Sequence, residues 1–262
     1  STLPKNTIDE SKWINATAKK FGLNHFYCNS ENLDYEDYQK FINFQEEPVQ
    51  TSSAYYQYLL RKKIKEHGLK VLMVGEGADE VYGGYKRCLF YYLNYMDLDK
   101  KKLSGFLLKS GNFMQNDINT VLSNYLRFKS RINTNLSDIE DLSSQKYLKK
   151  KSSKRFLSIP KNSKNFFKDA LISHMTKRDL PYVLRMEDKN SMSQSIEARV
   201  PFLDHKMVEY VFNIKTQYFM KNGQNKYILR SCFKNYFSKD VLNRKEKSAR
   251  PGDNANFIFN TF

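Results

Sequence analysis

The spacing of apolar residues predicts amphipathic helices in the first part of the chain. Apolar residues recur every three or four positions after the polar segment 7–10, and Gly22 closes this first predicted helix. The same spacing predicts helices over residues 31–44 and 52–68, the second of which begins at a serine and stops at a glycine.

Two short apolar segments read as strands. Residues 25–28 form one candidate, and residues 69–74 form another because their apolar run Val71–Val74 is typical of a buried strand. A helix is predicted between them. This strand–helix–strand order predicts parallel pairing with a right-handed crossover.

The remainder of the chain has few strand signals. Residues 88–150 read as helices and loops, and Ser152–Asn165 reads as a linker with Pro160. Helical spacing returns further on, and the tail from Ser248 is expected to be irregular. The later predicted helices cover residues 166–175, 204–212 and 226–237.

An acidic loop follows the strand predicted at residues 69–74. It reads Gly75-Glu-Gly-Ala-Asp79-Glu80, so three carboxylates lie within five residues. The first acid lies between the two glycines, and the other two follow them. Ligands of open α/β sheets bind beyond the carboxyl ends of strands, and a metal–phosphate complex would explain the acids. The alternative is that Asp79 and Glu80 only begin a helix, where acids complement the helix dipole.

Three further runs follow the acidic loop in order along the chain, namely Arg185–Asp204, Lys226–Arg230 and Arg244–Lys247. Together with the loop, they resemble the synthetase domain of glutamine-dependent asparagine synthetase. The family's loop GEGxDExFxGY is similar to Gly75–Tyr85, with Tyr82 in the phenylalanine position. Its signature RxxDxxSMxxxxExRxPFLD is met at Arg185–Asp204. Lys226–Arg230 resembles its K-x-x-L-R helix, and Arg244–Lys247 resembles its R-x-x-K segment. The resemblance spans roughly residues 70–250.

The resemblance implies an α/β fold, namely a partial parallel-sheet ATP-pyrophosphatase (adenine nucleotide alpha hydrolase-like) fold with a mainly helical C-terminal part. We expect one incomplete synthetase domain over residues 1–262, with an α/β part at 1–87 and a mainly helical part at 88–262. The family's glutaminase domain and its SGGxDS phosphate loop have no counterpart in this sequence. We therefore expect these 262 residues alone to bind ATP poorly and to make no asparagine.

The resemblance also implies roles for three residues. Asp79 is the candidate ligand of Mg²⁺, and an N-cap role is compatible with it. Glu76 would act at the reacting centre, orienting the amino acid or taking a proton from ammonia. Lys226 would contact phosphate or the transition state as a point charge, although a lone lysine on a helix usually faces solvent. We expect Asp79 and Lys226 to face one cleft.

Further residues are candidates for binding substrate or ATP. Glycines let backbone approach a ligand, and guanidinium groups suit carboxylates or phosphates. The alternatives are a helix-start role for Glu80 and salt bridges that fasten helices for the arginines. Pro201–Asp204 reads as a helix entry capped by Asp204. The candidates are Gly75, Gly77, Glu80, Arg185, Arg199 and Arg230.

The implied reaction uses ATP and Mg²⁺ as cofactors and aspartate as substrate, with ammonia supplied from glutamine by a glutaminase domain of the full-length protein. Relatives with the same loops act on other carboxylates, including sugar acids, peptides and β-lactam precursors. Glu76 favours the asparagine synthetase branch, because a tyrosine commonly takes this position in the β-lactam synthetases. A homodimer is a candidate assembly that the sequence does not decide.

Charge and cysteine content narrow the possible binding partners and the possible cellular compartment. The net charge of +16 would suit a nucleic-acid module, but the lysines are scattered, and the cluster Lys149–Arg155 reads as a solvated segment. We therefore expect no nucleic-acid partner. The three cysteines and four histidines show no metal spacing, and free buried thiols suit a reducing cytoplasm. No apolar run approaches the ~20 residues that span a bilayer, so no membrane association is expected.

Overall fold

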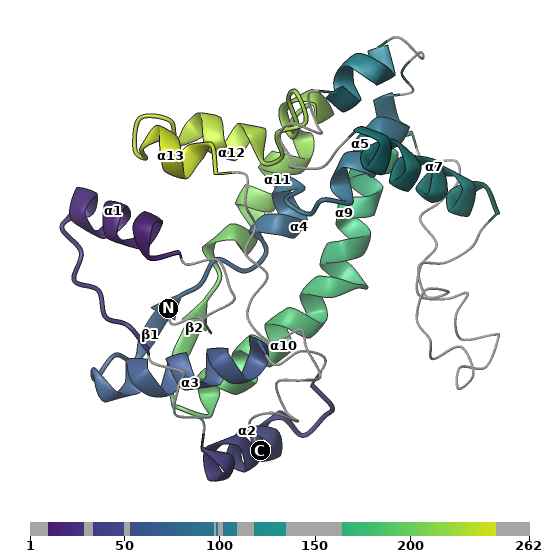
Figure 1. Cartoon of the computed structure of the whole chain (residues 1–262). Coiled ribbons are helices and arrows are strands. Elements are labelled where there is room, and N and C mark those ends of the chain that lie inside the picture. Colours follow the sequence, from purple (N-terminus) through teal and green to yellow (C-terminus); the bar gives the residue numbers. More distant parts are fainter. Residues whose placement is uncertain are drawn as a thin grey trace. The chain divides into compact units, whose positions relative to one another are not determined.

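The computed structural model describes residues 10–28, 34–49, 53–96, 98, 102–108, 118–134 and 164–244 (Figure 1). They fall into two compact units, each assembled from separate segments. Unit 1 takes residues 1–74, 183–199 and 235–262, and unit 2 takes residues 75–182 and 200–234. Most of the predicted linker, the cluster Lys149–Arg155 and the tail from Ser248 lie outside the described residues.

Unit 1 contains the first predicted helices. The helix that was expected to close at Gly22 ends there, because Gly22 takes the left-handed conformation (φ 62°) and its N–H donates to the carbonyl of Ala18. Asp34 caps the next helix by accepting a hydrogen bond from the N–H of Glu36. The elements are α1 (Ser11–Phe21), α2 (Tyr35–Gln45), α3 (Ser53–Glu66), β1 (Val71–Met73), β2 (Glu197–Arg199) and α13 (Lys239–Leu242), with most of α10 (Asp179–Met192).

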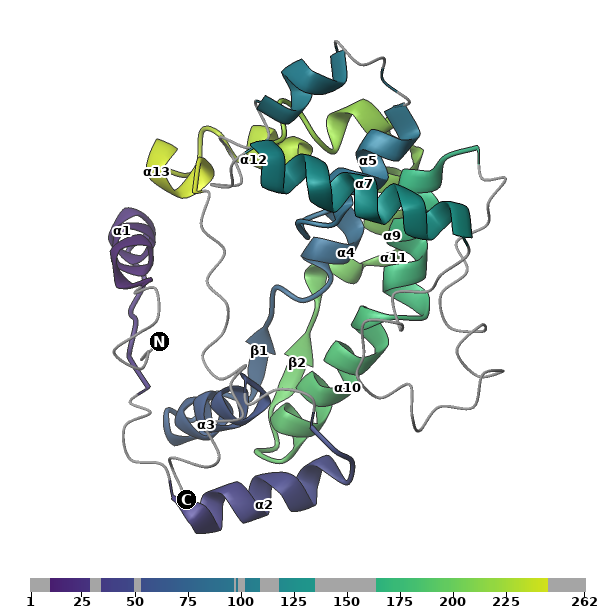
Figure 2. The same cartoon turned by 45° about the vertical axis from the view of Figure 1, so that its right-hand side comes forward.

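The sheet of unit 1 differs from the expected one. β1 pairs in parallel with β2, Val71 facing Glu197 and Met73 facing Arg199, so parallel pairing is confirmed but the partner was wrong (Figure 2). Residues 25–28 form no strand; the ring of Phe26 instead stacks on His67. The expectation of a buried strand is also wrong. Val71 is 46% exposed and Met73 71% exposed, because β2 is the one described strand that pairs with β1.

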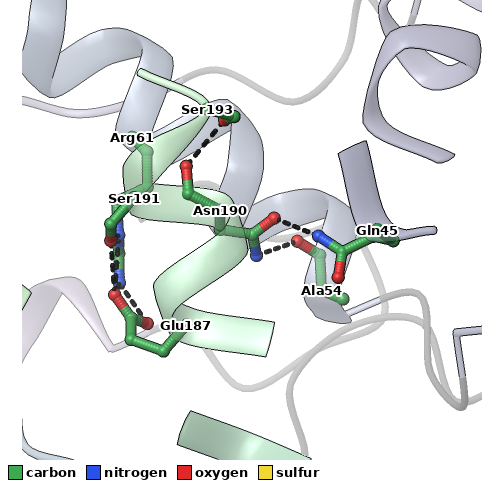
Figure 3. A network of polar contacts seen from close by, with 7 residues as sticks. All are labelled: Gln45, Ala54, Arg61, Glu187, Asn190, Ser191 and Ser193. Carbon is green, nitrogen blue, oxygen red and sulfur yellow. Dashed lines mark hydrogen bonds and ion pairs between the residues drawn. The ribbon is translucent and has the colours of Figure 1, made fainter. Parts of the chain in front are cut away.

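A buried polar network joins α10 to α2 and α3 (Figure 3). The guanidinium of Arg61 donates through Nη2 to both carboxylate oxygens of Glu187, each at 2.6 Å, and the hydroxyl of Ser191 donates to the same carboxylate. One turn away, the amide of Asn190 accepts from Gln45 at 2.7 Å and donates to the carbonyl of Ala54. Their pairing satisfies polar groups that would be costly to bury alone.

Unit 2 is mainly helical, as the resemblance implied for the later part of the chain. Residues 102–108 are helical as well. Asp204 caps the helix after Pro201–Leu203, as the sequence predicts, by accepting from the N–H of Met207. The named elements are α4 (Ala78–Tyr82), α5 (Cys88–Met96), α7 (Ile118–Thr134), α9 (Phe166–Thr176), η3 (Pro201–Leu203), α11 (His205–Asn213), η4 (Thr216–Tyr218) and α12 (Tyr227–Cys232).

The core of unit 2 forms around α9, which packs on α4 and α5 (Figure 1). Phe167 of α9 is fully buried and meets Tyr92 and Phe219 edge-on. Phe167 also lies against Gly83, where a Cβ atom would come within 2.9 Å of its ring. α9 therefore supports the turn that follows α4.

The helix predicted at residues 226–237 is shorter in the structure. Lys226 has a left-handed backbone (φ 50°), so α12 starts after it, and the helix ends at Cys232. Phe233 and Tyr236, which lie beyond its end, are 40% and 58% exposed. The three cysteines are free as expected, but only Cys88 is buried. None of the helices within the described ranges has the length and apolarity that a membrane crossing requires.

Candidate active site

The acidic loop enters unit 2 through a glycine turn. Gly77 takes the left-handed conformation (φ 88°) and forms the N-cap of α4. A Cβ atom at Gly77 would also overlap the side chain of Leu203. Glycine is therefore needed for both backbone conformation and space. This turn places Asp79 and Glu80 in the first turn of α4, as the helix-start alternative predicted.

Asp79 and Lys226 form an ion pair. The Nζ atom of Lys226 lies 2.8 Å from Oδ1 of Asp79, and both side chains are about a quarter exposed, at 23% for Lys226 and 27% for Asp79. The expected proximity of these two residues is thus confirmed. Their partial exposure leaves both charges within reach of a ligand.

The backbone of Gly84 packs against this pair. Its N–H donates to the carbonyl of Asp79 at 2.8 Å, and its carbonyl accepts from the amide of Asn225 at 2.5 Å. A Cβ atom at Gly84 would overlap Asp79 Oδ1 and the Cε atom of Lys226. The turn after α4 and the segment before α12 are thereby fastened together around the two charges.

The segment before α12 is held by Arg230. Its Nε atom donates to the carbonyl of Asn225 at 3.0 Å, and burial lowers the pKa of this guanidinium. Asn225 and Lys226 are therefore fixed from the helix that follows them. The left-handed backbone of Lys226 is uncommon for a residue other than glycine, and such conformations concentrate at functional sites. Arg230 thus supports the site in this structure.

The two glutamates of the loop have different surroundings. Glu76 is partly exposed, between Gly75 and Gly77. Glu80 is 3% exposed, and its carboxylate accepts a hydrogen bond from the hydroxyl of Tyr85. Burial raises the pKa of Glu80, against the opposing effect of that hydrogen bond. The geometry favours a structural role for Glu80, whereas the side chain of Glu76 stays partly exposed.

Arg185 and Arg199 belong to unit 1, whereas Asp79 belongs to unit 2. Arg185 pairs with Glu47 at 2.6 Å, and Arg199 pairs with Glu197 at 2.9 Å. The first pair joins α10 to the segment after α2, as the salt-bridge alternative predicted, whereas the second lies within β2 and fastens no helices. All four side chains are at least a quarter exposed, so these pairs are of the kind that contributes little to stability.

Three further residues shape this site without having been singled out as candidates. Gly84 and Tyr85 lie inside the loop motif, so the motif itself carried a signal for them. Asn225 carried no signal beyond its place next to Lys226. Its role depends on a contact with Gly84, which is distant in the sequence.

The donor set around Asp79 fits Mg²⁺ only in company with a nucleotide. Within the described ranges, no group of three or more acidic, histidine or cysteine side chains could hold a metal ion. Asp79 supplies one carboxylate beside a lysine. Mg²⁺ is commonly bound by one or two carboxylates together with substrate phosphates, so this arrangement fits an ion that arrives on a nucleotide and does not fit a self-contained metal site.

A scan against protein families assigns almost the whole chain. The family described as Asparagine synthase matches residues 2–259. The chain belongs to the asparagine synthase family. The acidic loop, the Arg185–Asp204 run and Lys226 all lie within the matched region, so the resemblance found from the motifs is confirmed.

Curated members of the asparagine synthase family show the extent of the likeness. Asparagine synthetase [glutamine-hydrolyzing] 3 of Bacillus subtilis (strain 168) is 26% identical over 91% of this chain and 36% of its own length. Asparagine synthetase [glutamine-hydrolyzing] 1 of the same organism is 27% identical over 77% of this chain and 33% of its own.

A relative with a different name is also similar. Amidase chry2 of Gibberella zeae is 24% identical over 92% of this chain and 41% of its own length. This asparagine synthase family chain thus spans about two-fifths or less of the curated relatives described here. No solved structure matches it significantly.

Proposed function

We propose that this chain is an ATP-dependent amide-forming ligase domain that converts aspartate into asparagine, with AMP and pyrophosphate as the other products. The proposal is supported by membership of the asparagine synthase family and by the printed names of the Bacillus subtilis relatives. A glutaminase domain in the full-length protein would supply ammonia, and the expected compartment is the cytoplasm.

The chemistry needs activation because hydroxide is a poor leaving group. The aspartate carboxylate attacks the α-phosphorus of ATP, and the bond to the β-phosphate breaks to release pyrophosphate. Ammonia then attacks the carbonyl carbon of the acyl-adenylate, AMP leaves, and one proton is lost. The protein has to hold the phosphates, offset their developing charge and accept that proton.

The residues of the site have matching roles in this proposal. Lys226 would contact phosphate oxygens and offset negative charge on the leaving group. Asp79 would hold Mg²⁺, which supplies neutralisation of phosphate charge when bound. Glu76 would orient aspartate or accept the proton of the attacking ammonia. Gly75 and Gly77 would let the backbone approach the nucleotide.

The observation that carries the proposal is the Asp79–Lys226 pair held around Gly84. Any residue larger than glycine at position 84 would displace both Asp79 and Lys226. A purely structural ion pair would gain nothing from this restriction. A site that must keep one carboxylate and one ammonium at a fixed spacing does gain from it. The same residues occupy the family's acidic loop and its K-x-x-L-R segment.

The test is made on the protein at the length its gene encodes, with the 262-residue chain assayed beside it. With ATP, Mg²⁺, aspartate and ammonia, the natural-length protein is expected to form asparagine and AMP in equal amounts. The 262-residue chain alone is expected to form neither, because its sequence has no SGGxDS loop. Turnover by the 262-residue chain, or AMP release that does not depend on aspartate, would contradict this part of the proposal.

A second candidate keeps the reaction and changes the acceptor carboxylate to a sugar acid, a peptide or a β-lactam precursor. The likeness to amidase chry2 favours it weakly. Pyrophosphate release, measured with a panel of carboxylic acids, separates the two candidates.

A further inference from the structure

A second polar network lies in unit 2, beyond the residues assigned to ATP and aspartate. It begins at Glu80, which accepts a hydrogen bond from Tyr85, and continues to Arg87, whose guanidinium lies 4.5 Å from the centre of the Tyr85 ring. Nη2 of Arg87 then pairs with Oδ2 of Asp179, at the start of α10. The same carboxylate oxygen lies 2.5 Å from Nδ1 of His174.

His174 is the innermost member of this network. It is 1% exposed, and its Nε2 atom lies 3.1 Å from the hydroxyl of Tyr91, whose ring stacks on the imidazole. Burial lowers the pKa of His174, so the neutral ring is favoured. Burial opposes ionisation of Asp179, but the hydrogen bond from His174 and the charge of Arg87 outweigh it and lower the pKa of that carboxyl.

These conditions select one tautomer of the imidazole. An ionised carboxylate only accepts hydrogen bonds, so Nδ1 of a neutral His174 carries the proton and donates it to Asp179. Nε2 is then an acceptor for the hydroxyl of Tyr91. The ring is held at both nitrogens, and the orientation of the Asp179 carboxylate is fixed from the core of unit 2.

The network reaches the site through one turn. Tyr85 follows Gly84, whose backbone packs on Asp79 and Lys226, and Glu80 follows Asp79. A displacement of the Tyr85 side chain would therefore move the turn at Gly84. Because Gly84 packs closely on Asp79 and Lys226, a movement of the turn would also move the ion pair.

We propose that Asp179, oriented by His174, is a positioning residue that fixes the Gly84–Tyr85 turn through Arg87 and thereby sets the spacing of Asp79 and Lys226. Asp179 and His174 act on the site only through Arg87 and Tyr85, and the Tyr85 ring also lies 6.1 Å from the imidazole of His174. The inference deepens the proposed function and rests on it for its effect on turnover. Its effect on the turn is independent of any activity.

The experiment compares Asp179→Asn and His174→Phe with the unaltered chain by amide hydrogen exchange, followed in the segment 79–88. Both variants are expected to exchange roughly tenfold faster at Gly84, whose N–H donates to the carbonyl of Asp79, because local opening of the turn becomes easier. His174→Gln is expected to restore most of the protection, since its amide offers one donor to Asp179 and one acceptor to Tyr91.

The matched control is Asp34→Ala in unit 1. Asp34 caps α2 by accepting from the N–H of Glu36, so its loss lowers stability without touching the network. This control is expected to leave exchange at Gly84 as in the unaltered chain. Equal loosening of the turn by Asp34→Ala, or unchanged exchange in both network variants, would overturn the proposal.

Turnover provides the second measurement, on the natural-length protein. Asp179→Asn is expected to lower kcat roughly tenfold, with a smaller change in KM for ATP, because groups that act on developing charge are displaced. If the turn loosens as expected while the unaltered protein makes no asparagine, the proposed function fails and the positioning role stands. An unchanged turn overturns the positioning role whatever the activity.

Discussion

Gly84 lies so close to Asp79 that no larger residue fits between the turn and the carboxylate. A Cβ atom there would come well inside 3.0 Å of Oδ1 of Asp79 and would also meet the side chain of Lys226. Only glycine, which has no Cβ atom, lets the turn lie this close to the ion pair.

Gly84→Ala is therefore expected to damage the site. The added methyl group should cost about 1–3 kcal/mol in the free energy of unfolding, the usual range for overpacking, and should abolish most amide formation. Gly105→Ala is the control, because Gly105 lies in a helical segment and a methyl group added there would have nothing within 4 Å. It should raise stability by roughly 0.5–1 kcal/mol. Urea unfolding and asparagine formation measure both variants.

Removing either charge of the ion pair should separate activity from stability. Asp79→Asn and Lys226→Met are each expected to lower kcat/KM for ATP by roughly a hundredfold or more, while the free energy of unfolding changes by less than about 1 kcal/mol because the pair is partly exposed. Lys62→Met is the matched control, since Lys62 pairs with Asp37 at 2.5 Å in unit 1. Comparable losses in the control and in the site variants would argue against a catalytic role.

The buried pair of Arg61 and Glu187 should behave in the opposite way. Glu187→Gln leaves a buried guanidinium without its counter-charge, and a loss of about 3–5 kcal/mol in the free energy of unfolding is expected. The double variant Arg61→Met with Glu187→Leu should recover most of that loss, because it removes both buried charges. Denaturant unfolding of the three chains tests this. A double variant no more stable than Glu187→Gln would contradict it.

Glu80 should make stability fall as pH rises. Burial raises the pKa of Glu80 above its ordinary value of 4.5, so the folded chain binds this proton more tightly than the unfolded chain does. The stabilisation is full below that ordinary value and is lost as pH rises through the pKa of the folded state. Glu80→Gln is expected to be the more stable chain at pH ~7, and the difference should vanish near pH ~4. Thermal unfolding across this range provides the measurement; a difference that grows towards acid pH would contradict it.

Local signals predicted the helices well. Gly22 and Asp204 carry their capping information within a few residues, and the corresponding helix ends were confirmed. The partner of β1 was not predictable in this way. β2 has the sequence Glu-Ala-Arg, with two exposed charged side chains, and it forms because its backbone meets β1 from far along the chain.

The candidate site was also only partly predictable, because some of its contacts lie within motifs and others join segments that are distant in the sequence. The motifs brought Asp79 and Lys226 together, and the structure confirms that they meet. No motif pointed to His174 and Asp179, which lie on different helices, because their relation depends on Arg87 and Tyr91 from other elements. The start of α12 was misplaced because the spacing of apolar residues does not reveal the left-handed backbone of Lys226.

The pairing of β1 with β2 has a consequence for biosynthesis. Unit 1 takes its strands from residues 71–73 and 197–199, and the whole first segment of unit 2 is translated between them. On the ribosome, β1 must therefore wait for its partner while that segment emerges. Neither unit can be expressed as one uninterrupted piece, and a chain terminated at residue 182 would leave β1 without the strand that it pairs with here.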